Sequence, residues 1–215
     1  MKQLFWNDIN AINLLEKVLK RGEIVLAEGD TVLGLLADIS AHGYHALDVL
    51  KNRSHKPYLV LVSDMQKALN LIEKNDILLF QIEKLMKSYW PGPLTLLLKA
   101  KKNLPSYMVS DQGAIGIRIP DHQGLIQLLQ KCEGLFSTSA NKSGDLVPGC
   151  VDDVHDDIKQ SVAYFVMNEK NGKPNDLPST ILDCTGEKII VVREGALSST
   201  QLMKELSTIG GHFVQ

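Results

Sequence analysis

Short apolar runs separated by polar turns recur along the chain and predict strands. Runs of this length, bounded by Gly, Pro, Asn or Asp, are typical of buried strands. They predict strands at 24–27, 58–62, 94–98, 115–119, 134–138, 162–167, 179–184 and 188–192. The last two runs flank Thr185-Gly186, a turn sequence, and we expect them to pair as a hairpin.

Apolar residues spaced three and four positions apart predict helices between these strands. The first helix, capped by Asn7 or Asp8 and ended by Gly22, should bury Ile9, Ile12, Leu15, Val18 and Leu19. Further helices are expected at 43–51 with Leu47 and Leu50 inward, at 64–72 capped by Asp64, at 75–89 capped by Asn75 or Asp76, and at 123–131, 151–159 and 199–206. The WPGP sequence at 90–93 ends the 75–89 helix, and segments 28–34 and 99–113 are expected to be loops.

Interspersed strands and helices with at least one hairpin favour an α+β (mixed α/β) fold, a twisted mixed sheet flanked by helices. No proline-rich or low-complexity linker divides the sequence, and no internal repeat is visible. We therefore expect one domain over residues 1–215.

Composition narrows the class of protein. The chain has 215 residues, is 44% hydrophobic and 22% charged, and carries a formal net charge of -2, so no global charge attracts it to nucleic acid. Its three cysteines, Cys132, Cys150 and Cys184, form no CxxC pair and indicate a reducing compartment. No apolar run reaches signal-peptide or membrane-span length. We expect a cytoplasmic protein without membrane contact.

Small polar and cationic residues gather at the predicted strand ends, which often converge on one crevice. The stretch FSTSANKSG at 136–144 places three hydroxyls and an amide, those of Ser137, Thr138, Ser139 and Asn141, after an apolar run. The set is Asp30, Thr31, Lys51, Arg53, Arg118, Ser139, Asn141, Ser179, Thr180 and Arg193. Because it holds several cations and a single acid, it predicts a seat for phosphate or carboxylate.

Other chemistries fit the sequence less well. Ser139 has no GxSxG elbow and no evident histidine base, which argues against a serine nucleophile. His42 and His45 lack a third ligand, so no metal site is expected. Arg118 lies between apolar neighbours and must face water, a carboxylate or a ligand.

The order of six motifs resembles the YrdC-like family of threonylcarbamoyl-adenylate synthases, in its short TsaC type. The motifs are KNRSHKP, WPGPLTLLL, GIRIPDH, STSANKSG, LPSTILD and VVREG, and the resemblance covers residues 12 to 197. It implies synthesis of threonylcarbamoyl-adenylate and pyrophosphate from L-threonine, bicarbonate and ATP with Mg²⁺. The product would pass to a tRNA threonylcarbamoyl transferase that modifies adenosine 37 of tRNAs reading ANN codons.

The resemblance also assigns roles by position. Lys51, Arg53, Ser139 and Asn141 match the family's catalytic tetrad for the nucleotide and its phosphates. Lys56 and Arg193 would be further ATP contacts. Arg118 would hold the threonine carboxylate, with Thr31 and Ser179 beside the amino acid.

The sequence departs from the family pattern at its amino-acid end. Glu28-Gly29 replaces the usual Pro-Thr pair, Leu33 replaces an aromatic residue, and Leu61 stands where many relatives have histidine. The segment from Arg53 to Pro57 is one residue short, which bears on the place of Lys56. Two alternatives therefore stay open: a paralogue with altered or lost synthase activity that binds nucleotide, and a protein that binds double-stranded RNA or tRNA through cations at 51, 53, 56, 99, 101 and 102.

Overall fold

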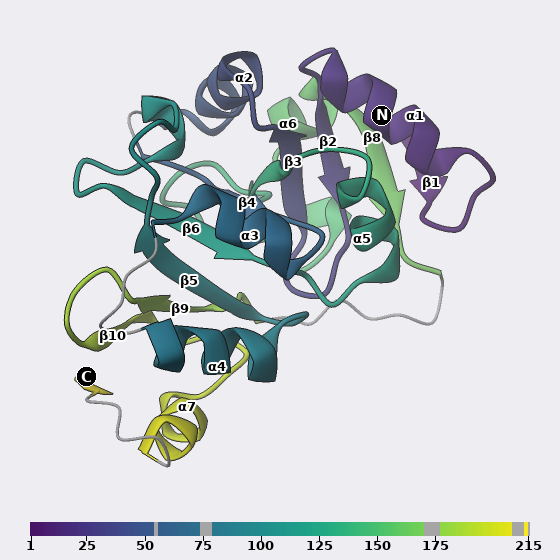
Figure 1. The fold of residues 1–215 in the computed structure, drawn as a ribbon. Coiled ribbons are helices and arrows are strands. Elements are labelled where there is room, and N and C mark those ends of the chain that lie inside the picture. The colour runs from purple at the N-terminus through teal and green to yellow at the C-terminus, as the bar shows by residue number, and fades with distance from the viewer. Residues whose placement is uncertain (54–55, 74–78, 170–176, 208–212, 215) are drawn as a thin grey trace.

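A mixed sheet forms the centre of the protein (Figure 1). The structure is a computed structural model that describes residues 1–53, 56–73, 79–169, 177–207 and 213–214. In this part of the chain eleven strands join in the order β1-β8-β2-β3-β7-β4-β6-β5-β9-β10-β11. They are β1 Lys2–Phe5, β2 Ile24–Ala27, β3 Gly34–Asp38, β4 Leu59–Leu61, β5 Leu94–Lys99, β6 Ala114–Arg118, β7 Leu135–Ser139, β8 Val162–Met167, β9 Thr180–Asp183, β10 Ile189–Arg193 and β11 Phe213–Val214.

Helices lie against both faces of the sheet. They are α1 Ala11–Lys20, α2 Ala41–Lys51, α3 Met65–Leu71, α4 Leu79–Tyr89, α5 Gln123–Leu129, α6 Asp156–Ser161 and α7 Ser199–Ser207, with short 3-10 turns at Ser106–Met108 and Val151–Asp153. Helix α1 packs against α5 and β2, whereas α2 packs against β3 and α6. None of the helices in the described ranges is long and apolar enough to cross a bilayer.

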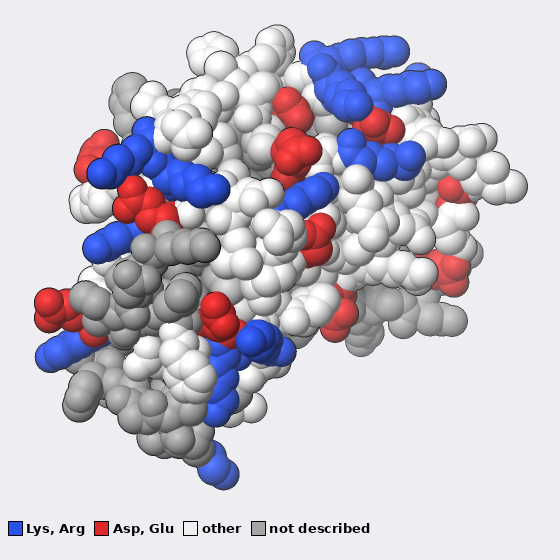
Figure 2. Space-filling view, in the orientation of Figure 1, with Lys and Arg blue, Asp and Glu red and all other residues white. Residues whose placement is uncertain are grey.

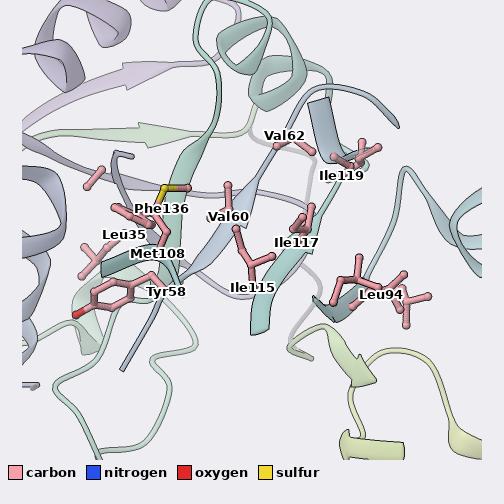
Figure 3. Packing of buried hydrophobic residues seen from close by; sticks show 14 of the residues in the cluster. Leu35, Tyr58, Val60, Val62, Leu94, Met108, Ile115, Ile117, Ile119 and Phe136 are labelled. Carbon is pink, nitrogen blue, oxygen red and sulfur yellow. The ribbon is translucent and has the colours of Figure 1, made fainter. Parts of the chain in front are cut away.

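Alternating side chains divide the interior into two cores. On β2, Val25 and Ala27 join the core under α1 and α5, while Ile24 and Leu26 join the larger core on the opposite face. This division follows from the period of two along a strand. In the larger core, shown in Figure 3, Phe136 packs against Tyr58 with ring centroids 6.0 Å apart.

Some side chains of the α1/α5 face stay only partly buried where the sheet continues beyond β3. Leu59 of β4, Gly116 of β6 and Leu97 of β5 point to this face, and each is of intermediate burial. The opposite face of the same strands is fully buried, with Val60 and Ile117 at 0% exposure. The sheet thus has one covered face and one face that is covered over only part of its width.

The fold class and most predicted elements are confirmed. Strands β2, β5, β6, β7 and β8 lie within one residue of their predicted bounds, and β9 and β10 pair antiparallel as expected. Asp64 caps α3 by accepting a hydrogen bond from the Lys67 amide at 2.9 Å. Leu47 and Leu50 are buried, and Trp90, with its indole bound to the Leu94 carbonyl, lies in the core. The proposed caps Asn75 and Asp76 lie outside the described residues.

Several local predictions are wrong. Helix α1 begins at Ala11 with Asn10 at its N-cap, so the predicted caps Asn7 and Asp8 precede it, as does Ile9, which is 93% exposed. Strands β1, β3 and β11 were not expected, and β3 follows directly after the 28–33 loop. The predicted helix at 151–159 is a 3-10 turn followed by α6, which begins only at Asp156.

The Phe136 cluster generates a stability prediction. Phe136 is fully buried and its ring meets three tyrosine rings, so Phe136→Ala should lower the free energy of unfolding by about 3–5 kcal/mol. Phe80→Ala is the matched control because Phe80 is 68% exposed, and it should cost less than about 0.5 kcal/mol. Urea unfolding of both variants measures the difference. Equal costs would show that the ring cluster is not a centre of the core.

Candidate active site

The predicted site residues lie along the partly covered face of the sheet or at the element ends beside it, since Lys51 ends α2 and Arg53 follows it, and α2 packs on the opposite face. The middle of the partly covered face is a row of Ser137, Leu59, Gly116 and Leu97, which the strand registers place side by side. A Cβ on Gly116 would approach the Leu97 side chain to 3.2 Å, so glycine leaves space above this row.

Two groups of polar residues lie on either side of the row. The first, the Lys51 end, consists of Lys51, Arg53, Ser139 and Asn141. The second, the Arg118 end, consists of Asp30, Thr31, Thr95, Arg118, Ser179 and Arg193.

Strand geometry separates these two ends. Arg118 is level with Leu61 and Leu135, whereas Ser139 lies four residues further along β7 and two strands away. With about 3.3 Å per residue and about 4.8 Å per strand, the Cα atoms of Arg118 and Ser139 are roughly 16 Å apart. The sequence-predicted residues thus lie on one surface but in two groups.

Lys51 fastens the end of α2 to the end of β7. Its ammonium donates to the Ser139 carbonyl at 2.7 Å, the Asn141 carbonyl at 2.6 Å and Asn141 Oδ1 at 3.3 Å. A lysine has three N–H groups, so the protein itself occupies all of them. The side chain is 3% exposed. Lys51 therefore shapes the turn after β7 more directly than it presents charge to a ligand.

The polar side chains after β7 are fixed by the same turn. Ser139 Oγ donates to Asn141 Oδ1 at 2.6 Å, and Asn141 Nδ2 donates to the Asp145 carbonyl at 2.6 Å. Gly144 adopts φ +93°, a conformation that suits glycine in this turn. Ser139 and Asn141 remain partly exposed and are held in one arrangement.

Arg53 follows α2 and lies over an aromatic ring. Its guanidinium carbon is 4.9 Å from the Tyr58 ring centroid, and Nη2 donates to the Pro57 carbonyl at 3.3 Å. Its Nε is buried and meets no acceptor among the described residues. A buried N–H without a partner is costly, and a ligand oxygen would satisfy it. Lys56, the further ATP contact implied by the resemblance, is exposed.

Arg118 provides the cation of the second end. It is buried and forms an ion pair with the Asp30 carboxylate. Its side chain is 4% exposed, and Nη1 donates to both Asp30 carboxylate oxygens at 2.8 and 2.7 Å. Its Nη2 approaches Thr31 Oγ1 at 3.4 Å. The sequence left water, a carboxylate or a ligand as partners for Arg118, and the structure shows the carboxylate of Asp30.

Ser179 and Arg193 join the Arg118 end through hydroxyl contacts. Arg193 Nη2 donates to the Ser179 carbonyl at 2.8 Å and reaches Ser179 Oγ at 3.3 Å. Ser179 Oγ is 2.8 Å from Thr95 Oγ1. The β5–β6 register pairs Leu96 with Ile117, so the next pair along places Thr95 opposite Arg118. Partial burial, and then the Arg118 charge, lower the pKa of Arg193. The second arginine is therefore close to the first.

Sequence reasoning did not assign roles to Asp30 and Thr95. Asp30 precedes Thr31 in EGDT, and Thr95 is the one polar residue inside the apolar strand LTLLL. A buried polar residue within an apolar strand was the available signal for Thr95. A separate cavity of about 730 Å³ lies between α2 and α6, lined by residues such as His42, His45 and Asp157, and none of the predicted site residues lines it.

The unusual Glu28-Gly29 pair is accommodated by local contacts. The Glu28 amide donates to the Val166 carbonyl at 2.9 Å, a bond that proline could not make. Its carboxylate accepts from the Asn168 amide at 2.7 Å. A Cβ on Gly29 would come within 3.0 Å of Leu125. Proline in place of Glu28 would therefore lose the bond to Val166, and a side chain in place of Gly29 would press on Leu125.

This arrangement can bind a ligand that carries anionic groups at two separated points. The described residues contain no group of three or more His, Cys, Asp or Glu that could hold a metal ion. At the Lys51 end, the partnerless Arg53 Nε can donate to a phosphate oxygen, while Ser139 Oγ and Asn141 Oδ1 are neutral oxygens of the kind that bind the hydrated Mg²⁺ that accompanies phosphate.

The burial of Lys51 generates a pH prediction. Burial, together with the nearby Arg53 charge, lowers the pKa of Lys51 from 10.5 to about 8. Between these values the unfolded chain holds a proton that the folded protein has released, so rising pH favours the folded state. Relative to Lys51→Met, the wild type should gain up to about 1.4 kcal/mol of unfolding free energy per pH unit above about pH 8. Urea unfolding from pH 7 to about 9.5 measures this difference, and a pH-independent difference would contradict it.

The chain resembles known proteins along most of its length. The Sua5/YciO/YrdC family model, described as telomere recombination, matches residues 17–195. A Methanocaldococcus jannaschii protein, provisionally named threonylcarbamoyl-AMP synthase, is 31% identical over 90% of this chain and 89% of its own length. The threonylcarbamoyl-AMP synthase of Blochmanniella pennsylvanica is 30% identical over 80% and 88%, respectively.

Solved structures share the fold. Pyrococcus abyssi Sua5 complexed with L-threonine superposes with a TM-score of 0.80 at 23% identity, covering 94% of this chain. Escherichia coli YciO gives a TM-score of 0.77 at 20% identity, covering 92% of this chain and 95% of its own. The chain spans only 58% of the P. abyssi Sua5 chain. From the family match over residues 17–195 and these relatives, we conclude that the chain belongs to the Sua5/YciO/YrdC family.

Proposed function

We propose that the chain is an L-threonylcarbamoyladenylate synthase, which makes threonylcarbamoyl-AMP and pyrophosphate from L-threonine, bicarbonate and ATP. The observation that carries the proposal is the two-ended cationic surface, with Arg53, Ser139 and Asn141 at one end and Arg118 at the other. Curated relatives of similar length carry this enzyme name, and the P. abyssi Sua5 structure contains L-threonine. The enzyme is a nucleotidyltransferase that supplies tRNA modification.

The reaction needs positioning and charge neutralisation more than a protein nucleophile. The threonine amine combines with bicarbonate to give a carbamate and water. A carbamate oxygen then attacks the α-phosphorus of ATP, and the bond to pyrophosphate breaks. Phosphoryl transfer of this kind is accelerated mainly by holding the reactants in line and neutralising developing charge. A surface with few acids suits that task.

The chain's residues divide these tasks between the two ends. Arg118 binds the threonine carboxylate, with Thr31 and Ser179 beside the amino acid. Arg53, Ser139 and Asn141 bind the nucleotide and its phosphates. Lys51 acts on the same end by fixing the turn that presents Ser139 and Asn141. Lys56 remains proposed as a further ATP contact. Arg193, which the resemblance also assigned to ATP, lies beside Ser179 and is proposed instead as a cation of the Arg118 end.

Mg²⁺ would reach the site as part of the nucleotide complex. Phosphate oxygens and water supply most ligands of nucleotide-bound Mg²⁺, so a protein carboxylate cage is unnecessary. Ser139 Oγ and Asn141 Oδ1 are the hard oxygen donors of the Lys51 end. When bound, the ion would neutralise charge on the leaving pyrophosphate.

The RNA-binding alternative has less support. Lys51, one of its proposed cations, is 3% exposed and bonded within the protein. On the face shown in Figure 2, basic side chains are scattered and most lie beside acidic ones. Phosphate backbones are bound by continuous basic surfaces, so this face does not favour RNA. Delivery of the product to a tRNA threonylcarbamoyl transferase is part of the proposal, as is a cytoplasmic location.

Product analysis tests the reaction itself. Purified protein with ATP, Mg²⁺, bicarbonate and L-threonine should give threonylcarbamoyl-AMP by mass spectrometry, with one pyrophosphate for each product molecule. Omission of any one substrate should abolish the product. ATP binding without product would instead favour the paralogue with lost or altered activity.

Matched arginine variants test the division of the site. Arg118→Lys should weaken L-threonine binding about tenfold or more, because lysine cannot make a two-point contact with a carboxylate, and should leave ATP binding unchanged. Arg53→Lys should do the reverse. Isothermal titration with each ligand measures both affinities, and Arg21→Lys, at an exposed arginine, is the control. Equal losses for both ligands in each site variant would contradict two separate ends.

A further inference from the structure

Asp30 and Arg118 form a buried ion pair within the site. The two side chains are 8% and 4% exposed, and they join residues 88 positions apart in the sequence. A buried pair of this kind needs further hydrogen bonds to offset the loss of water. Asp30 Oδ2 has such a bond, because it also accepts from the Asp121 amide at 2.8 Å. The carboxylate is thus held from two sides.

Asp30 engages only one nitrogen of Arg118. Both carboxylate oxygens accept from Nη1, while Nε has no partner among the described residues and Nη2 has only the long 3.4 Å contact to Thr31. In a guanidinium group, the Nε and Nη2 hydrogens lie along one edge and match the two oxygens of a carboxylate. Asp30 therefore leaves a binding edge of Arg118 available and fixes the guanidinium from its other end.

Asp30 also changes the charge of the Arg118 end. Arg118 and Arg193 are close enough for the charge of the first to lower the pKa of the second. Two cations and one carboxylate leave a single net positive charge there. One ligand carboxylate would neutralise that charge, and a second would be left buried without a counter-charge, which is costly.

We propose that Asp30 is a positioning and specificity residue: it holds Arg118 by Nη1 and cancels one of two positive charges, so the Arg118 end accepts an amino acid with one carboxylate and rejects a dicarboxylate. This inference rests on the proposed function, since it takes the Arg118 end to be the amino-acid site. Asp30 acts through Arg118 and does not itself contact the reacting atoms.

L-Asparagine and L-aspartate are the probes, because they have nearly the same shape and differ in one charge. Each competes with L-threonine for the wild type, for Asp30→Asn and for Asp30→Glu, and isothermal titration gives the affinities. In the wild type, L-aspartate should bind at least about tenfold more weakly than L-asparagine. Asp30→Asn should reduce that ratio about tenfold, whereas Asp30→Glu, which keeps the charge, should preserve most of it.

A purely structural role would weaken both competitors equally and leave their ratio unchanged, which would overturn the inference. Asp64→Asn is the matched control, because Asp64 also accepts a backbone N–H but lies at the start of α3. If Asp30→Asn does not fold, Asp30→Ser removes the same charge and keeps a hydrogen-bond acceptor. A wild type that binds ATP but not L-threonine would overturn the proposed function and the inference with it. An unchanged ratio in a wild type that binds L-threonine overturns the inference alone.

Discussion

The alternation of side chains along β7, β4, β6 and β5 is the constraint on which the site depends. Residues that point to one face, such as Phe136 and Ile117, are fully buried in the larger core. Their neighbours point to the other face, which α1 and α5 cover only in part. Because the period of a strand is two, the same strands can anchor the fold and present a polar surface. Strand length then sets the distance between the two ends of that surface.

Buried charge organises each end of the surface in a different way. Lys51 is compensated by neutral oxygens, which ties α2 to the turn after β7 and lowers the cost of keeping the cation inside. Arg118 is compensated by the Asp30 carboxylate, which leaves part of its guanidinium available. The first arrangement builds the shape of a binding turn, and the second prepares a cation for a ligand. Both place residues that are distant in sequence in direct contact.

The sequence predicted the fold class and most central strands because continuous apolar runs have few alternatives. It did not predict β1, whose sequence KQLF is half polar because Lys2 and Gln3 are exposed at the edge of the sheet. Strand β3 was obscured by Gly34 and by the polar loop that precedes it. Its pairing with β2 and β7 depends on contacts across the sheet, which a local pattern does not contain.

The candidate residues were predicted by type and order, but their grouping was not. The predicted single anion site is instead two ends of one surface, because Arg118 and Ser139 lie at opposite ends of β6 and β7, which are separated by β4. The Asp30 contact could not be predicted from spacing, since the pair forms only when the 28–33 loop reaches the end of β6. Glu28 and Gly29 are departures from the family motif that the surrounding contacts explain.

The most direct test of the two-ended surface is amide NMR of the labelled protein titrated separately with L-threonine and with ATP. We expect L-threonine to shift amides around Asp30, Thr95 and Arg118, and ATP to shift those around Arg53 and from Ser139 to Asp145. Shifts from either ligand that centre on the cavity between α2 and α6, around His42 and Asp157, would contradict this expectation.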